Sequence, residues 1–345
     1  MDTLTHAISG AVLARATGSG KPQVDEIPLL TRTVIGFLAA AFPDTDFVLR
    51  FIDPMLYLTA HRGVTHSIVM LPLWALLLSF IFHLLWKKRY SWKKFYVICA
   101  IGIGIHIFGD LITSFGTMIL APVSDMRFSF STTFIIDLYF SGILLTGLVL
   151  SLFLPVVKTA RLTGIVLAGY ISFQAVLHYQ ALVIAKNYAK QQELISASIH
   201  VLPQPLSPFN WKLVVEQNDK LHIAYINLIA DEIPEQPTVD AGFLTMLASA
   251  YYPVTQAHWE THERFGKTEL ERHFARQVWE HETFARFRWF AMFPVLHGFE
   301  ENKERVCAWF ADLRFALKGR QPPFVYGMCR NKNPSENWSL NRLKR

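Results

Sequence analysis

Residues 95–110 read FYVICAIGIGIHIFGD, an apolar run that ends with a histidine and an aspartate four residues apart. A helix needs roughly 20 apolar residues to cross a bilayer, and apolar sequence continues to Ala121, so we expect a membrane span over Phe95–Ala121. An ionisable group inside hydrocarbon costs on the order of 3 kcal/mol or more unless it meets a counter-ion, a metal or water. His106 and Asp110 therefore indicate that this span carries a polar site.

The overall composition favours a membrane protein. Of the 345 residues, 52% are hydrophobic and only 17% are charged, which is too apolar for an ordinary soluble chain of this length. Three more runs are long enough to cross: Val64–Trp86, Phe134–Val157 and Leu162–Ala185. The run Thr33–Phe42, of about 10 residues, is too short and suits a re-entrant or packed helix. We expect an N-terminal helical or re-entrant segment in residues 1–63, then an α-helical polytopic membrane domain with about four transmembrane helices in residues 64–186.

The composition changes in residues 187–345, which are more polar than the residues before them. Alternating apolar residues on both sides of Gln217–Lys220 are typical of a β-hairpin, and further helical and strand patterns follow. The predicted elements are strands Trp211–Glu216 and Leu221–Leu228, helices Asp240–Ala250 and Thr268–Phe293, and strands Arg305–Leu317 and Pro323–Cys329. We expect a small α+β extramembrane domain. Cys307 and Cys329 fall on two strands that can pair, so they are either a disulfide or two free thiols.

Basic residues predict the orientation in the membrane. They crowd the loop between the first two spans and the loop between the last two: Lys87, Lys88, Arg89, Lys93 and Lys94 in one, Lys158 and Arg161 in the other. The positive-inside rule makes both loops cytoplasmic. The polar residues of the spans, and the domain of residues 187–345, then face the extracytoplasmic side.

Because so many bases lie in these loops, the net charge of +6 does not indicate a nucleic-acid partner. No basic region precedes the first apolar stretch, so we expect the N-terminus to be retained rather than cleaved as a signal peptide.

Histidines and carboxylates gather at one end of these spans. His106 and Asp110, four apart on a helix, share a face and can offer one nitrogen and one oxygen to the same ion. Gly63 interrupts any helix between His61 and His66, and Thr65 is a plausible N-cap. Asp44 follows Pro43 at the end of an apolar segment. The candidate metal ligands are His6, Asp44, His61, His66, His106 and Asp110.

Imidazole and carboxylate ligands suit a divalent metal, zinc first, with manganese or iron as alternatives. An open position on such an ion lowers the pKa of a bound water toward neutrality. Asp46 or Asp137 could then act as general base, and Arg62 could stabilise an anionic transition state. The number of candidate ligands leaves open either two ions or one ion with outer carboxylates that orient the histidines.

The motifs that carry these residues resemble those of the YdjM-like family of membrane-bound metal-dependent hydrolases, also described as LexA-binding and inner-membrane-associated. The resemblance covers roughly residues 1–185. It rests on Asp2-x-x-Thr5-His6, Pro43-Asp44-x-Asp46, His61-Arg62-Gly63-x-Thr65-His66-Ser67, Asp110-x-x-Thr113-Ser114-x-Gly116-Thr117 and Asp137. It implies a bacterial inner-membrane protein with a hydrolase site formed by His6, Asp44, Asp46, His61, His66, His106, Asp110 and Asp137.

A polar site at the depth of the outer headgroups favours a membrane lipid or lipid-linked ester or phosphoester as the substrate. Two other classes of function remain open. A transporter would place its ionisable groups near the bilayer midplane, often on broken helices. A non-enzymatic scaffold or regulator would need a large cytoplasmic surface, which the predicted topology does not leave.

Overall fold

The computed structural model describes residues 1–19, 26–235, 237–238, 240–318, 320–331 and 338–343. It divides into two compact units, Met1–Val176 and Leu177–Arg345. The first unit is helical and the second contains the β-sheets. A helical N-terminal half followed by a β-sheet domain was predicted from the sequence, and this division is confirmed.

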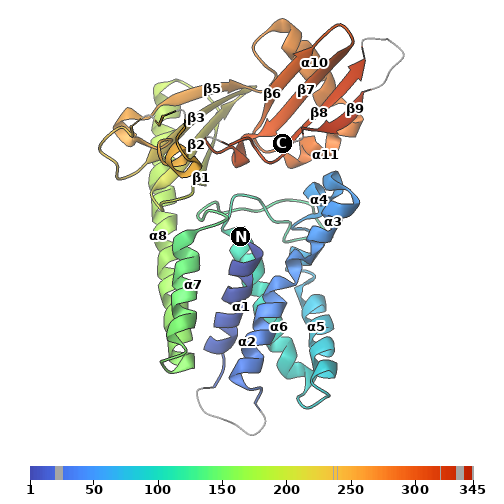
Figure 1. Ribbon diagram of the computed structural model, residues 1–345, viewed down its shortest axis with the longest axis vertical. Coiled ribbons are helices and arrows are strands. Elements are labelled where there is room, and N and C mark those ends of the chain that lie inside the picture. Colours follow the sequence, from blue (N-terminus) through green and yellow to red (C-terminus); the bar gives the residue numbers. More distant parts are fainter. Residues whose placement is uncertain (20–25, 236, 239, 319, 332–337, 344–345) are drawn as a thin grey trace. The chain divides into compact units, whose positions relative to one another are not determined.

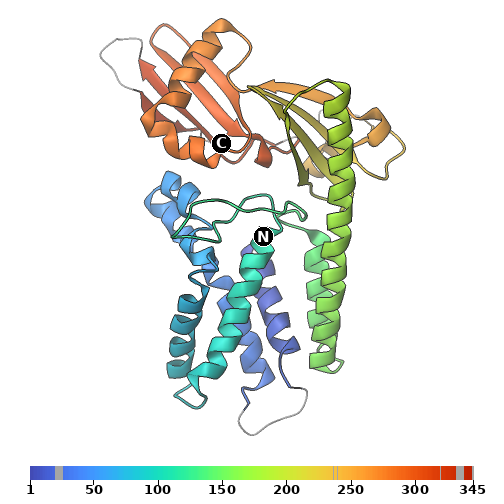
Figure 2. The ribbon, with the colours of Figure 1, turned by 180° about the vertical axis from the view of Figure 1, so that it is seen from behind.

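The helices of the first unit run alongside one another (Figure 1). They are α1 (Thr3–Ala16), α2 (Leu29–Ala41), α5 (Leu71–Leu85), α6 (Trp92–Leu111), α7 (Leu138–Leu150) and the first part of α8 (Val156–Gln191). Short helical turns separate α2 from α5: η1 (Pro43–Val48), α3 (Leu49–Ile52), α4 (Pro54–Ala60) and η2 (Val64–His66). The N-terminus and the non-helical residues 112–137 lie at one end of the unit, and the α5–α6 and α7–α8 turns lie at the other (Figures 1 and 2).

Fewer helices than expected are long and apolar enough to cross a membrane. Among the described residues, α6 and α8 meet that standard, and the number rises to three if Pro54–His66 and α5, which meet at 77°, form one broken span. The expected span that begins at Phe95 is helical only to Leu111, because Thr113 turns back onto the carbonyl of Asp110 and Gly116 adopts a φ of +91°. The expected third span is represented by the 13 residues of α7, which begins at the cap Asp137.

Small residues let three helices approach closely. A Cβ added to Gly10 of α1 would lie 2.3 Å from the carbonyl oxygen of Gly36 on α2, and one added to Gly102 of α6 would lie 2.8 Å from the Cβ of Ala39. Close backbone approach at small residues is the usual way that helices pack in membranes. It brings the last turns of α2 and α6 and the first turns of α1 together at one end of the unit.

The second unit contains two antiparallel-rich sheets. In the first, β1 (Ser198–Pro203), β2 (Asn210–Gln217) and β3 (Lys220–Asn227) are consecutive, and β4 (Tyr252–Pro253) and β5 (Trp259–Glu263) both pair with β3. The second has the order β6 (Pro294–Glu301), β7 (Arg305–Asp312), β8 (Val325–Asn331) and β9 (Ser339–Arg342). Trp211, Leu213 and Val215 of β2 are buried with Leu177, Ala181 and Ala185 of α8, which is why α8 continues well beyond a membrane span.

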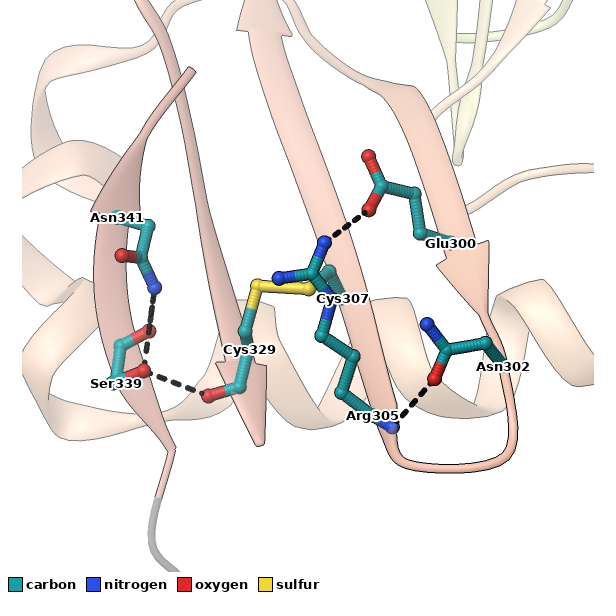
Figure 3. Close-up of a disulfide and its surroundings, with 7 residues drawn as sticks. All are labelled: Glu300, Asn302, Arg305, Cys307, Cys329, Ser339 and Asn341. Atoms are coloured by element: carbon teal, nitrogen blue, oxygen red, sulfur yellow. Dashed lines mark hydrogen bonds and ion pairs between the residues drawn. A yellow bond between two sulfur atoms is a disulfide. The ribbon is translucent and has the colours of Figure 1, made fainter. Parts of the chain in front are cut away.

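The structure confirms the predicted hairpin, since β2 and β3 pair in register from Asn210–Asn227 to Gln217–Lys220. The predicted helix Thr268–Phe293 is broken instead into α10 (Glu269–Glu280), η4 (Glu282–Phe284) and α11 (Ala285–Phe290), because the backbone at His281 is extended. The remaining short elements are α9 (Phe243–Ala248), η3 (Val254–Gln256) and η5 (Leu313–Phe315). Cys307 and Cys329 lie opposite each other on β7 and β8 and form a disulfide (Figure 3).

Candidate metal centre

One oxygen of Asp110 is surrounded by hydrogen-bond donors. This carboxylate is fully buried in the last turn of α6, and its Oδ1 lies 2.6 Å from the amino nitrogen of Met1, 3.0 Å from Nε2 of His6 and 2.9 Å from Nη2 of Arg62. A buried carboxylate is stable only when its charge is paired and hydrogen-bonded. The three donors satisfy Oδ1, and Oδ2 is the oxygen of this carboxylate that has no hydrogen-bond donor among the described residues.

The other oxygen of Asp110 faces two histidine nitrogens. Oδ2 lies 3.3 Å from Nε2 of His66 and 3.5 Å from Nε2 of His106, and all three side chains have zero exposure. None of these three atoms has a hydrogen-bond partner among the described residues. An unsatisfied buried polar atom costs about 1–3 kcal/mol, and the ligand atoms of these three residues lie close enough together to hold a metal ion.

The tautomer of His106 is fixed by α2. Its Nδ1 lies 2.6 Å from the carbonyl oxygen of Ala40, which can only accept, so Nδ1 carries the proton and Nε2 keeps a lone pair. This carbonyl is available because the last four carbonyls of a helix have no partner within the helix. The close approach at Gly102, one turn before His106, brings the two groups together.

The tautomer of His66 is fixed by a short relay. The hydroxyl of Thr65 donates to Oδ2 of Asp46 at 3.1 Å and lies 2.9 Å from Nδ1 of His66. Because its single hydrogen is used on Asp46, Thr65 accepts from Nδ1, and Nε2 of His66 keeps its lone pair. In their neutral forms, both histidines therefore present acceptors toward Oδ2 of Asp110, and a cation between these three atoms would stabilise the arrangement.

Asp44 supplies a fourth candidate ligand at the more open side. Its Oδ1 lies 3.5 Å from Nε2 of His66 and 3.7 Å from Nε2 of His106, while Oδ2 accepts a hydrogen bond of 2.6 Å from the hydroxyl of Thr3. Its side chain is 13% exposed, in contrast to the three buried ligands. Imidazole and carboxylate groups are common ligands of zinc, and manganese and iron also accept them.

His61 and Asp46 lie beside this ligand set. Nδ1 of His61 donates to Oδ1 of Asp46 at 2.8 Å, which leaves Nε2 as the acceptor of that ring. Ligand atoms of His61, Asp44 and His66 all lie within 4.8 Å of one another. The same closeness holds for His66, His106 and Asp110, and for His6, Asp44 and His106. The structure thus brings all six predicted metal ligands to one end of the helical unit.

The contacts of His6 suit a residue that orients Asp110. Its Nε2 donates to Oδ1 of Asp110, and its ring stacks on that of His106 with centroids 3.7 Å apart. Gly109 makes room for this ring, since a Cβ there would lie 3.1 Å from Nδ1 of His6. A ligand atom of His6 nevertheless lies within 4.8 Å of ligand atoms of Asp44 and His106.

Asp46, Asp137 and Arg62 were predicted to be catalytic, as general bases and as a group that stabilises the transition state. In the structure they make other contacts. Both oxygens of Asp46 are occupied, by Nδ1 of His61 on one side and by Thr65 and the backbone N–H of Arg62 on the other, so it orients histidines rather than acting as a free base. The guanidinium of Arg62 is 2% exposed and pairs with Asp110 and the hydroxyl of Thr113. Its positive charge balances the negative charge of Asp110 on the buried side of the cluster.

Asp137 lies outside the cluster. It caps α7, where its Oδ1 accepts from the N–H of Phe140 at 2.8 Å, and its Oδ2 accepts from the hydroxyl of Tyr170 at 2.8 Å. The assignment of Asp137 as general base therefore has no support in the geometry. The helix-cap position just before an apolar run was the signal in the sequence for this structural role.

Several groups that complete the site were not found from the sequence. They are the hydroxyl of Thr3, the carbonyl of Ala40, the relay through Thr65 and the amino group of Met1. Thr65 was predicted only as a helix cap. A backbone carbonyl or amine leaves no residue-type signal, so only the packing of α1, α2 and α6 reveals these contacts.

Comparisons with known proteins identify the family of this chain. The family model described as YdjM inner membrane protein matches residues 1–181. The chain is also 29% identical over 126 residues to the "Uncharacterized protein YfhP" of Bacillus subtilis (strain 168), a match that covers 36% of this chain and 38% of that protein. No solved structure matches. Because the family model covers more than half of the chain, including every histidine and carboxylate of the cluster, this chain belongs to the YdjM inner membrane protein family.

Proposed function

We propose that this protein is a membrane-bound metal-dependent hydrolase that cleaves an ester or phosphoester of a lipid or lipid-linked substrate. The observation that carries the proposal is the convergence of three buried, unpartnered atoms, Nε2 of His66, Nε2 of His106 and Oδ2 of Asp110. His66, His106 and Asp110, whose ligand atoms all lie within 4.8 Å of one another, would hold one divalent ion, with zinc as the first candidate. When bound, such an ion supplies a Lewis acid that lowers the pKa of water toward neutrality.

The residues around the ligands prepare them for this task. The carbonyl of Ala40 and the relay from Asp46 through Thr65 hold the two histidines in the tautomers that bind a metal. Outer hydrogen bonds of this kind also raise the basicity of the ligands. Arg62 balances the charge of Asp110 from the buried side. The partly exposed Asp44 leaves that side of the site open for substrate.

The surroundings of the site favour a lipid substrate. A cavity of about 380 Å³ borders Asp46 and Thr65 and continues along apolar residues that include Val64, Met118 and Ala121. Large apolar side chains are exposed on the segments at this end of the unit: Phe47, Val48, Phe51, Ile52, Leu120, Val123, Met126 and Phe130. Exposed apolar surface marks contact with a membrane, a protein or a ligand, and beside a polar site it favours a substrate that lies in the membrane.

We also propose that α5, α6, α7 and α8 cross a bacterial inner membrane, with the metal centre toward the extracytoplasmic side. The basic loops fall at the α5–α6 and α7–α8 turns, at the opposite end of the first unit from the N-terminus (Figure 1), and the positive-inside rule makes that end cytoplasmic. The disulfide between Cys307 and Cys329 supports an oxidising compartment for the second unit.

The metal content of detergent-purified protein tests the function. We expect at least one equivalent of zinc per chain, and a loss of that ion in His66→Ala and Asp110→Ala. His83→Ala is the matched control, because the Nδ1 of His83 binds the carbonyl of Tyr90 near the α5–α6 turn. Hydrolysis of lipid esters and phosphoesters should stop with a chelator and return with zinc. Equal metal content in all four proteins, or activity that ignores the chelator, would contradict the proposal.

Labelling of single cysteines in intact cells tests the topology. A membrane-impermeant maleimide should reach Val123→Cys, whose native side chain is 81% exposed near the site, without permeabilisation. Lys88→Cys, in the loop after α5, should react only after permeabilisation. The reverse pattern would overturn the orientation and leave the metal site untouched.

A further inference from the structure

We propose that the site has a second metal position, formed by His61 and Asp44 and placed beside the first. This inference rests on the proposed function, since it adds an ion to the same centre. Its consequence is a two-ion site, which is typical of phosphoester hydrolysis among other reactions. Of the two substrate classes proposed above, a second ion favours a phosphoester of a lipid or lipid-linked molecule.

The first argument is that His61 is held as a ligand would be. Its Nδ1 donates to Oδ1 of Asp46 at 2.8 Å, and a carboxylate behind the ring is the usual partner of a metal-binding histidine. The ring also stacks on Tyr57 with centroids 4.7 Å apart. Both contacts fix the ring plane and leave Nε2 with its lone pair.

The second argument is that His61 does not reach the first position. Donor atoms on one zinc lie at most about 4 Å apart, because each bond is about 2 Å long. Among the described residues, the groups whose ligand atoms all lie within 4.8 Å of one another join His61 to Asp44 and His66, but not to His106 or Asp110. One ion cannot bind His61 together with Asp110 in this arrangement.

The third argument is that Asp44 lies between the two positions. Its carboxylate contacts both histidines of the first position and belongs to the group that contains His61. The ions of a two-metal site typically lie about 3.5–4 Å apart, and Asp44 would be the carboxylate that holds the second one. The side chains of His61 and Asp44 are 12% and 13% exposed, so the second ion would be the one nearer solvent, with positions left for water or substrate.

Metal stoichiometry tests this proposal. The full-length protein in detergent is loaded with zinc, freed of excess ion by gel filtration and analysed by elemental mass spectrometry against chain concentration. We expect two ions per chain in the wild type and in His83→Ala, and one in His61→Ala. His61→Gln serves if the alanine variant elutes as aggregate. Manganese-loaded wild type should also give the paramagnetic resonance signal of a coupled pair, which does not depend on any variant.

The outcomes separate the two proposals. One ion in the wild type and one in His61→Ala, or an uncoupled manganese signal, would refute the second position and leave the hydrolase proposal intact. Loss of all metal in a well-folded His61→Ala would also refute it, since His61 would then serve the first ion. No metal in the wild type would remove the proposed function together with this inference.

Discussion

The Nδ1 atom of His106 on α6 lies 2.6 Å from the carbonyl oxygen of Ala40 on α2. This contact links the packing of two helices to the protonation pattern of a candidate metal ligand. It exists because Gly102 lets α6 approach the end of α2, where a carbonyl without an intrahelical partner is available. Metal binding should therefore depend on residues that never touch the ion.

Gly102→Ala should weaken metal binding without removing a ligand. The added Cβ would lie 2.8 Å from the Cβ of Ala39 and 3.1 Å from the carbonyl oxygen of Gly36, so α2 and α6 must separate. Overpacking of this kind costs about 1–3 kcal/mol. Gly104→Ala is the matched control, because its Cβ would meet only Leu71 at 3.8 Å. Zinc titration and thermal unfolding should both be altered in the first variant, and unchanged values there would contradict the link between packing and site.

Thr65→Val should raise the zinc dissociation constant by about 10-fold or more, since outer residues of metal sites typically contribute 10–100-fold. The valine keeps the shape of the side chain and removes the relay between Asp46 and His66. Thr59→Val is the control, because its hydroxyl only returns to the carbonyls of Met55 and Leu56 on α4. Competition with a chelating dye measures both constants. Equal constants would show that the relay does not orient His66.

Asp137→Ala should leave metal content unchanged and reduce stability. The substitution removes the cap of α7 and the acceptor for Tyr170, and loss of a helix cap costs about 1 kcal/mol. Thermal unfolding should shift to lower temperature while the metal per chain stays at the wild-type value. Loss of metal from a folded Asp137→Ala protein would show that Asp137 contributes to metal binding.

Lys212 should give the second unit a characteristic pH dependence. Burial lowers the pKa of this fully buried lysine to about 7, and the nearby carboxylate of Asp312 offsets only part of that effect. Between that value and the unfolded pKa near 10.4, the unfolded chain binds a proton that the folded chain does not. Stability from this group therefore rises with pH over that range, by up to about 1.4 kcal/mol per unit.

Comparison with Lys212→Met isolates the effect. Thermal unfolding of both proteins is measured from pH 6 to 10. The stability of the wild type relative to the variant should increase as the pH rises. The carbonyls of Leu313 and Ala316, which accept from Lys212, lose that donor in the variant at every pH. That loss shifts the whole curve without changing its slope. A difference that stays constant with pH would mean that Lys212 remains charged in the folded protein.

Because two of the three cysteines form a disulfide, the unreduced protein should contain one free thiol per chain. Cys307 and Cys329 are bonded and Cys99 is free but buried, so mass spectrometry after alkylation under denaturing conditions should find one modified cysteine without reductant and three with it. Removing the bond by Cys307→Ala with Cys329→Ala should destabilise the second unit by about 3 kcal/mol, given the 22-residue separation. Three alkylated cysteines without reductant would exclude the bond.

The sequence alone predicted a helical membrane unit followed by a β-sheet domain, and it named the histidines and carboxylates that the structure brings together. Long apolar runs favour a helical membrane unit. Ionisable groups in such runs require a partner, which marked His66, His106 and Asp110, while the short motifs before the runs added His6, Asp44 and His61. Alternation around Gln217–Lys220 similarly predicted the β2–β3 hairpin. These features are local, and residue type or period expresses them directly.

Tertiary structure decided the role of each residue. Asp46 and Asp137 look alike as acids next to helical segments, yet one orients two histidines and the other caps α7. Which nitrogen of His106 carries a proton depends on a carbonyl 66 residues away in the chain. Such contacts involve backbone groups or distances between helices, which no residue pattern encodes, and so only the tertiary structure could distinguish candidate ligand, orienting residue and cap.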